Sequence, residues 1–102
     1  MNATGHQRVA KALAEPRRFE ILEAIALNKE LSCGEIVEQF TVSQATISHH
    51  LKELINAGLV KPRREGQYCY YSLCPEVLSE YISELYQLVA INTAGQKSRD
   101  FI

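Results

Sequence analysis

The stretch Ser43-Gln44-Ala45-Thr46-Ile47-Ser48-His49-His50-Leu51-Lys52-Glu53-Leu54 decides the fold that we expect for this chain. Its apolar residues recur at helical spacing and predict one buried face, formed by Ile47, Leu51, Leu54 and Ile55. Ser43 is a preferred residue for the start of a helix, and Gly58 suits the left-handed conformation that often follows a helix end. The sequence therefore predicts a helix from Gln44 to Ala57.

Helices are also expected before this stretch. Pro16 can open a helix that runs to about Ala26, with an apolar stripe of Phe19, Leu22, Ile25 and Ala26. Ser32 and Glu35 match a capping box, which predicts a short helix from Cys33 to Gln39. Only three residues separate that helix from Ser43, so the two form a helix-turn-helix pair. An earlier helix is expected from His6 to Glu15, where Pro16 ends it.

A hairpin and a long helix are expected after Gly58. Residues 59–61 and 68–73 are rich in β-formers, and the turn between them contains Gly66. Pro75 then opens a helix to about Asn92 with a wide apolar stripe. The fold class is mainly α with a small β-hairpin wing, a winged helix-turn-helix. We expect one domain over residues 1–102, with residues 95–102 as a frayed tail.

This layout predicts a DNA-binding surface. Gln can pair with adenine, Thr and Ala can contact the thymine methyl group, and His or Lys can reach base edges or phosphates. The amides at the helix start and the basic hairpin can hold phosphates. The expected DNA-binding residues are Ser43, Gln44, Ala45, Thr46, His49, His50, Lys52, Lys61, Arg63 and Arg64. His50 lies beside the buried stripe, and we interpret it as a structural or phosphate-bonding residue.

Composition limits the other possibilities. The net charge of −1 is a mild argument against nucleic-acid binding, but residues 43–71 hold four basic and two acidic residues. Without a signal peptide pattern or an apolar run of membrane-spanning length, we expect a cytoplasmic protein with no membrane contact. We find no phosphate loop, paired-carboxylate site or metal motif, so we expect neither an enzyme nor a cofactor.

The chain resembles the ArsR/SmtB family of bacterial winged-helix repressors at residues 14–22, 43–54, 57–60 and 66–71. The resemblance implies a homodimer, built from the first and last helices, that leaves an imperfect palindrome in double-stranded DNA when a signal arrives. The apolar last helix favours the same dimer, because it would be badly exposed on so small a domain. The alternative is that this helix folds onto its own core. The expected interface residues are Val9, Leu13, Leu78, Tyr81, Ile82, Leu85 and Val89.

The signal is the part that the sequence leaves open. In the family that the chain resembles, metal-sensing members carry either Cys-x-Cys at the start of the third helix or a cluster of His and acidic residues on the last helix. Both of these metal sites are incomplete in this chain. A chelate of Cys69 and Cys74 is disfavoured, because positions an odd number apart face opposite sides of a strand. Cys33 is either a thiol sensor, since a helix start favours thiolate, or an inert apolar residue. Cys69 is expected to be packed. A protein-interaction module is a further alternative.

Overall fold

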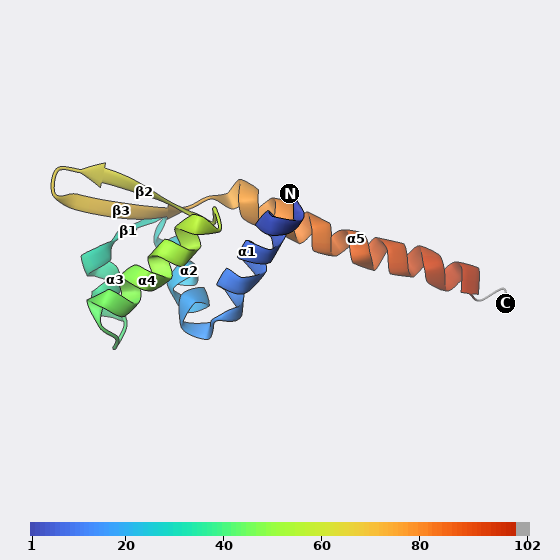
Figure 1. Cartoon of the computed structure of the whole chain (residues 1–102), viewed down its shortest axis with the longest axis horizontal. Coiled ribbons are helices and arrows are strands. Elements are labelled where there is room, and N and C mark those ends of the chain that lie inside the picture. The colour runs from blue at the N-terminus through green and yellow to red at the C-terminus, as the bar shows by residue number, and fades with distance from the viewer. Residues whose placement is uncertain (100–102) are drawn as a thin grey trace.

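The computed structural model describes the backbone of residues 1–99 and the side chains of residues 1–95. Its elements, in order, are α1 (Ala3–Ala14), α2 (Pro16–Asn28), β1 (Glu30–Ser32), α3 (Cys33–Gln39), α4 (Gln44–Asn56), β2 (Val60–Glu65), β3 (Tyr68–Leu73) and α5 (Pro75–Arg99). Figure 1 shows α1 to α4 gathered into a body, with the β2–β3 hairpin projecting from one end and α5 from the other. This is the expected winged helix-turn-helix arrangement.

Capping side chains begin α3 and α4 where the sequence predicts them, whereas α1 begins at Ala3, before the expected His6, where the Asn2 side chain accepts from the Gly5 amide at 2.7 Å. The Ser43 hydroxyl accepts a hydrogen bond from the Thr46 amide at 3.2 Å. In α3 both bonds of the capping box form, at 3.2 Å to Ser32 Oγ and at 2.8 Å from the Ser32 amide to Glu35. Each bond satisfies a helix-end amide that has no partner within the helix, so these residues fix the register of the helix-turn-helix pair.

The sheet has three strands, in the antiparallel order β1-β3-β2. The hairpin was predicted, but β1 was not, because three residues are too few to show the alternation of a strand. Its existence depends on pairing with β3, which places Leu31 opposite Tyr71 and Ser32 opposite Tyr70. The strand β1 therefore ties the base of the wing to the start of α3.

The core lies where α1, α2, α4 and the base of the sheet meet. It is formed by Val9, Ala12, Ile21, Leu22, Ala24, Ile25, Leu31, Ile36, Ile47, Leu51, Leu54, Leu59 and Val60. Two sequence expectations for α2 are wrong, because Phe19 is 44% exposed and Ala26 is exposed, while Ile21 and Ala24 are buried. This helix carries more apolar residues than one face can hold, so their spacing alone does not select the face.

Val9 also departs from expectation. It was predicted to lie in a dimer interface, but its side chain is 0% exposed within its own chain. A side chain with no accessible surface has nothing to offer a second copy, so Val9 is a core residue that holds α1 in place.

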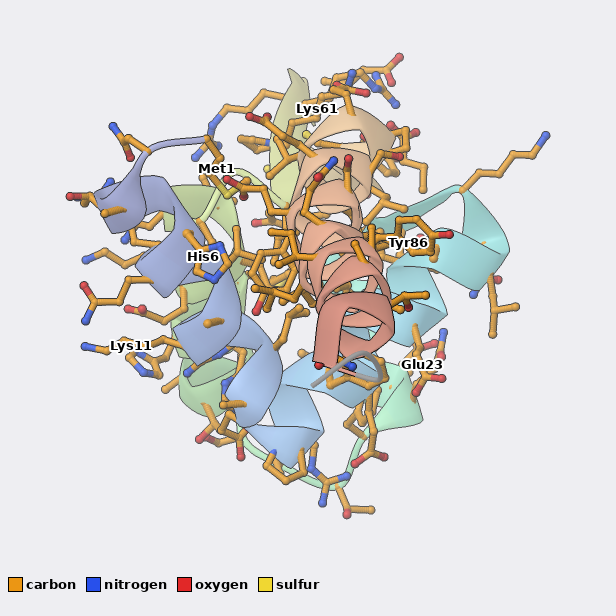
Figure 2. All side chains as sticks on the ribbon, turned by 90° about the vertical axis from the view of Figure 1, so that its right-hand side faces the viewer. Met1, His6, Lys11, Glu23, Lys61 and Tyr86 are labelled. Atoms are coloured by element: carbon orange, nitrogen blue, oxygen red, sulfur yellow. The ribbon has the colours of Figure 1, made fainter. Side chains whose placement is uncertain are left out.

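The last helix, α5, leaves the body after its first turns. Val77, Leu78 and Tyr81 pack against the core, whereas the apolar residues that follow are largely exposed: Ile82, Leu85, Tyr86, Leu88, Val89 and Ile91. Figure 2 looks toward the C-terminal end of α5, and Tyr86 lies on the side of α5 away from Met1 and His6 of the α1 region. The alternative, that α5 folds onto the core of its own chain, therefore holds only for the first turns of the helix.

The helix α5 is also longer than expected. It continues past Asn92 and Gly95 to Arg99, and the Thr93 hydroxyl bonds the Val89 carbonyl at 2.9 Å within it. The end of the expected frayed tail, residues 100–102, lies outside the described residues. Within the described part of the chain, no helix has the length and apolar character needed to cross a membrane.

Candidate nucleic-acid interface

The two faces of α4 differ as the sequence predicts. Ile47, Leu51 and Leu54 are buried against the body. The opposite side is exposed and polar, and it carries the predicted contact residues Ser43, Gln44, Ala45, Thr46, His49 and Lys52. Small side chains at the start of this face would let the backbone approach a ligand closely.

The first turn of α4 is held in position by its own side chains. The hydroxyls of Ser43 and Thr46 lie 2.9 Å apart, in addition to the capping bond. The Thr46 side chain is therefore oriented before any partner binds, and this lowers the entropic cost of ordering it in a complex.

His50 belongs to the interior and not to this polar face. Its side chain is buried, and its Nδ1 lies 3.4 Å from Nε of Arg18, which donates to it. Its Nε2 lies 3.8 Å from a carboxylate oxygen of Glu15, and that oxygen also accepts from the Arg18 amide at 2.7 Å. These contacts favour the structural one of our two interpretations of His50, and its place among the DNA contacts stays a prediction. The residue links the start of α2 to α4.

Burial sets the protonation state of His50. Desolvation lowers its pKa, and the charges of Arg18, His49 and Arg17 act in the same direction, while Glu15 opposes them. The geometry fits a neutral ring that accepts at Nδ1 and carries its proton on Nε2. Because the ring is neutral, the contact between α2 and α4 should not change with pH at values above the ordinary pKa of histidine.

The wing carries three exposed basic residues, Lys61, Arg63 and Arg64. Arg63, which we expected to hold a phosphate, is paired within the chain instead: it donates to both carboxylate oxygens of Glu30 at 2.8 and 3.0 Å and to Glu65 at 2.8 Å. The bonds to Glu30 and Glu65 raise the pKa of Arg63, and the same contact lowers the pKa of Glu30. Among the described residues, Lys61 and Arg64 form no ion pair.

Two cysteines flank the last residue pair of the β1–β3 ladder. Cys33 follows Ser32, the partner of Tyr70, and Cys69 precedes Tyr70, so an extension of the strand register by one residue would set Cys33 opposite Cys69. Both are half-buried free thiols near Tyr71, whose pKa is raised by burial, by a hydrogen bond with Cys69 and by Cys33. Sequence reasoning missed this pair because it missed β1.

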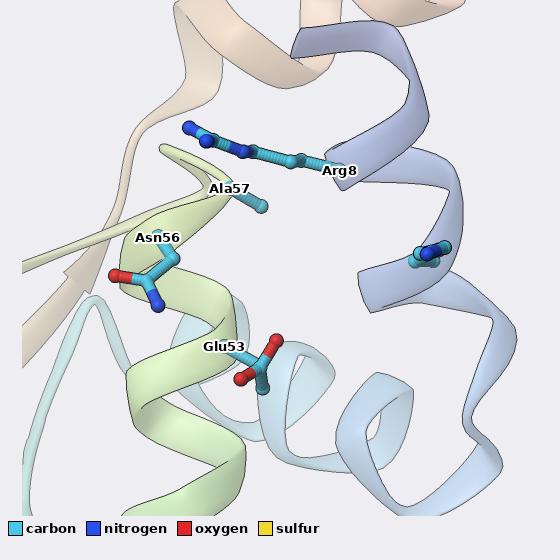
Figure 3. Close-up of a pocket in the computed structure, with 5 residues that line it drawn as sticks. Arg8, Glu53, Asn56 and Ala57 are labelled. Carbon is cyan, nitrogen blue, oxygen red and sulfur yellow. The ribbon is translucent and has the colours of Figure 1, made fainter. Parts of the chain in front are cut away.

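A hollow of about 390 Å³ lies between α1 and the C-terminal end of α4. Figure 3 shows Arg8 reaching across from α1 toward Ala57, with Glu53 and Asn56 on α4. The α4 residues that line the hollow, Glu53, Asn56 and Ala57, lie at the opposite end of the helix from Ser43. The hollow is therefore separate from the polar face. Among the described residues, no group of three His, Cys, Asp or Glu side chains is placed to hold a metal ion.

Comparison with known proteins places this geometry in a family. Residues 15–61 match the model of the bacterial regulatory protein, arsR family. The chain is 39% identical to the transcriptional repressor SdpR of Bacillus subtilis over 74% of this chain and 82% of that protein. It is 38% identical to the arsenical resistance operon repressor of Staphylococcus xylosus, over 86% of this chain and 81% of that protein.

The fold agrees with a solved structure. An ArsR-like transcriptional regulator from Rhodococcus sp. RHA1 superposes with a TM-score of 0.85, covering 93% of this chain and 89% of that chain at 23% identity. The similar proteins are transcriptional regulators and not enzymes, and regulators of this family bind DNA. The chain belongs to the arsR family of bacterial regulatory proteins.

Proposed function

We propose that this chain is a homodimeric, sequence-specific repressor that acts in the cytoplasm and is released from an imperfect DNA palindrome by a signal. The polar face of α4 carries the proposal, because its apolar counterpart is buried and nothing in the described chain covers the face itself. An amphipathic helix held in this way presents its first two turns to a major groove.

The chemistry of the face suits base reading. Gln44 can form two hydrogen bonds with adenine, and Ala45 and the Thr46 methyl group can contact thymine. His49 is exposed about one turn further on, where it could bond a base edge. The backbone amides at the N-terminus of α4 can hold a phosphate. Lys52, Lys61 and Arg64 supply positive charge to the phosphate backbone of DNA.

The dimer is supported by the exposed face of α5. Ile82, Leu85 and Val89 are 57%, 41% and 59% exposed, and they lie on one stripe of the helix. A contiguous apolar stripe of this kind marks an interaction surface. Of the other expected interface residues, Leu13, Leu78 and Tyr81 are half-buried by their own core, and they can contribute only the surface that remains.

Fluorescence anisotropy with the chain's own promoter fragment tests the proposal. We expect binding that prefers this fragment over scrambled DNA and that weakens steeply as salt increases. Insertion of half a helical turn between the two half-sites should abolish the preference, because a twofold dimer meets successive grooves about one turn apart. Binding without sequence preference at low salt would contradict the proposal and leave the protein-interaction alternative.

A second proposal concerns the signal, and the register of β1 and β3 favours it. We propose that Cys33 acts as a thiol sensor with Cys69 as its partner. A hydroperoxide would oxidise the Cys33 thiolate to a sulfenic acid and leave as the alcohol, and Cys69 would then form the disulfide and release water. The new bond would fix the start of α3 to the wing strand.

The test is DNA affinity before and after treatment with hydroperoxide. We expect oxidation to weaken binding in the wild-type protein and to have no effect in Cys33→Ser or in Cys69→Ser, with Cys74→Ser as the matched control. Mass spectrometry should find a Cys33–Cys69 disulfide. An oxidant effect that survives in both single variants would refute the role of this pair, while the DNA-binding proposal would stand.

A further inference from the structure

Arg63 connects all three strands of the sheet. It lies on β2 opposite Tyr70 of β3, and its guanidinium sits 4.8 Å from the centre of the Tyr70 ring. Beyond that ring it reaches Glu30 on β1, with bonds of 2.8 and 3.0 Å to the two carboxylate oxygens. A paired bond from a planar guanidinium to one carboxylate fixes direction as well as distance.

Apart from the ladder with β3, few packed side chains hold β2 in place. Only Val60 of β2 is buried, and the residues from Lys61 to Glu65 are all exposed. A two-stranded hairpin without a packed face is marginally stable in water. The contact with Glu30 therefore adds a direct side-chain link between β2 and the strand at the start of α3, beside the ladders that join each of them to β3.

The contact also decides which arginine is available for DNA. Two carboxylates surround Arg63, those of Glu30 and Glu65, so the three side chains together carry no positive charge. Arg64 is the next residue of the strand, lies opposite Cys69 and faces the other side of the sheet. It is exposed and has no acidic partner among the described residues.

We infer that Glu30 and Arg63 form a clamp that positions the wing for DNA binding, and that Arg64, not Arg63, makes the phosphate contact. The inference rests on the proposed DNA-binding function. In it, Glu30 and Arg63 are positioning residues, and neither touches DNA.

The main experiment measures the affinity for promoter DNA over a range of salt concentrations. We expect Glu30→Gln and Arg63→Gln each to weaken binding about two- to fivefold, the range of an exposed ion pair, with the salt dependence unchanged. Arg64→Gln should instead lower the slope of log affinity against log salt by about 1, as expected for one lost phosphate contact. Glu38→Gln, an exposed acid on α3, is the charge-matched control for Glu30→Gln.

A charge swap separates positioning from contact. The double variant Glu30→Arg with Arg63→Glu restores an ion pair between β1 and β2 but removes the arginine from position 63. We expect its affinity to return to within about twofold of the wild type. A swap that binds no better than Arg63→Gln, together with a smaller salt slope in Arg63→Gln, would overturn the clamp and make Arg63 a phosphate contact.

Amide hydrogen exchange in the free protein tests the clamp without DNA. We expect faster exchange at β2 and β3 in Glu30→Gln and normal exchange in the charge swap. Unchanged exchange in Glu30→Gln would refute the clamp even if the protein binds DNA. Faster exchange in a protein that binds no promoter DNA would refute the proposed function and leave the clamp in place.

Discussion

The helices α4 and α5 differ in the chemistry of the surface that they expose. In α4 the apolar face is buried by the chain itself and the polar face is exposed. In α5, beyond its first turns, the apolar stripe of Ile82, Leu85 and Val89 is exposed. An exposed polar face suits a hydrated, charged partner such as DNA, whereas an exposed apolar stripe is typical of an interface with another protein. One small domain thus presents two surfaces with different chemistry.

The largest expected effect tests whether α4 and α5 really differ in burial. Leu54→Ala should lower the free energy of unfolding by about 2–5 kcal/mol, because it leaves a cavity in the core. Leu88→Ala, on the exposed part of α5, should have little effect on the monomer. Urea denaturation at a concentration where the chain is monomeric measures both. Equal losses would contradict the comparison.

The next prediction concerns the partner of α5. Leu85→Glu with Val89→Glu should weaken dimerisation by at least about 100-fold, or about 2.7 kcal/mol, because two charges would be buried without partners. The control is Ser83→Glu with Gln87→Glu, which adds the same charge to the polar side of α5. Sedimentation equilibrium gives the mass of each variant. A dimer that survives the first pair and not the second would place the interface elsewhere.

A smaller effect is expected from the polar face of α4. Thr46→Ala with His49→Ala should weaken specific binding about 10- to 100-fold, because base contacts are lost, and should leave non-specific binding and dimerisation unchanged. Asn56→Ala, exposed at the far end of the same helix, is the control. Circular dichroism checks that helicity is retained. An equal loss on specific and scrambled DNA would show that the two residues contact only phosphates.

The smallest effect is a pH dependence of the contact between α2 and α4. Unfolded histidine titrates near pH 6.5, and burial lowers the pKa of His50 in the folded chain. Protons therefore favour the unfolded chain between these two values, and stability should decrease as pH falls below about 6.5. His50→Gln should remove this part of the pH dependence, and His49→Gln should retain it. Urea denaturation from pH 7.5 to 5 at fixed protein concentration measures the slopes, and identical slopes would refute the assignment.

Most of the body of the fold could be predicted from the sequence because its signals are local. Ser43 and the Ser32–Glu35 pair mark helix starts through bonds made within a few residues, and the period of Ile47, Leu51 and Leu54 selects the face of α4. The exposure of the candidate DNA-binding face followed from the same period. These features depend on neighbours in the chain, so they are set before any long-range packing is known.

The tertiary structure alone decided the features that depend on residues far apart in the chain. The strand β1 exists through its pairing with β3, and this pairing puts Cys33 and Cys69 at the same end of the ladder. Arg63, expected as a phosphate contact, is paired within the chain because Glu30 lies across the sheet. Val9 moved from an expected interface to the interior, since burial depends on which element covers a residue. Sequence periodicity gives a helix its faces, and only packing determines which of them is covered.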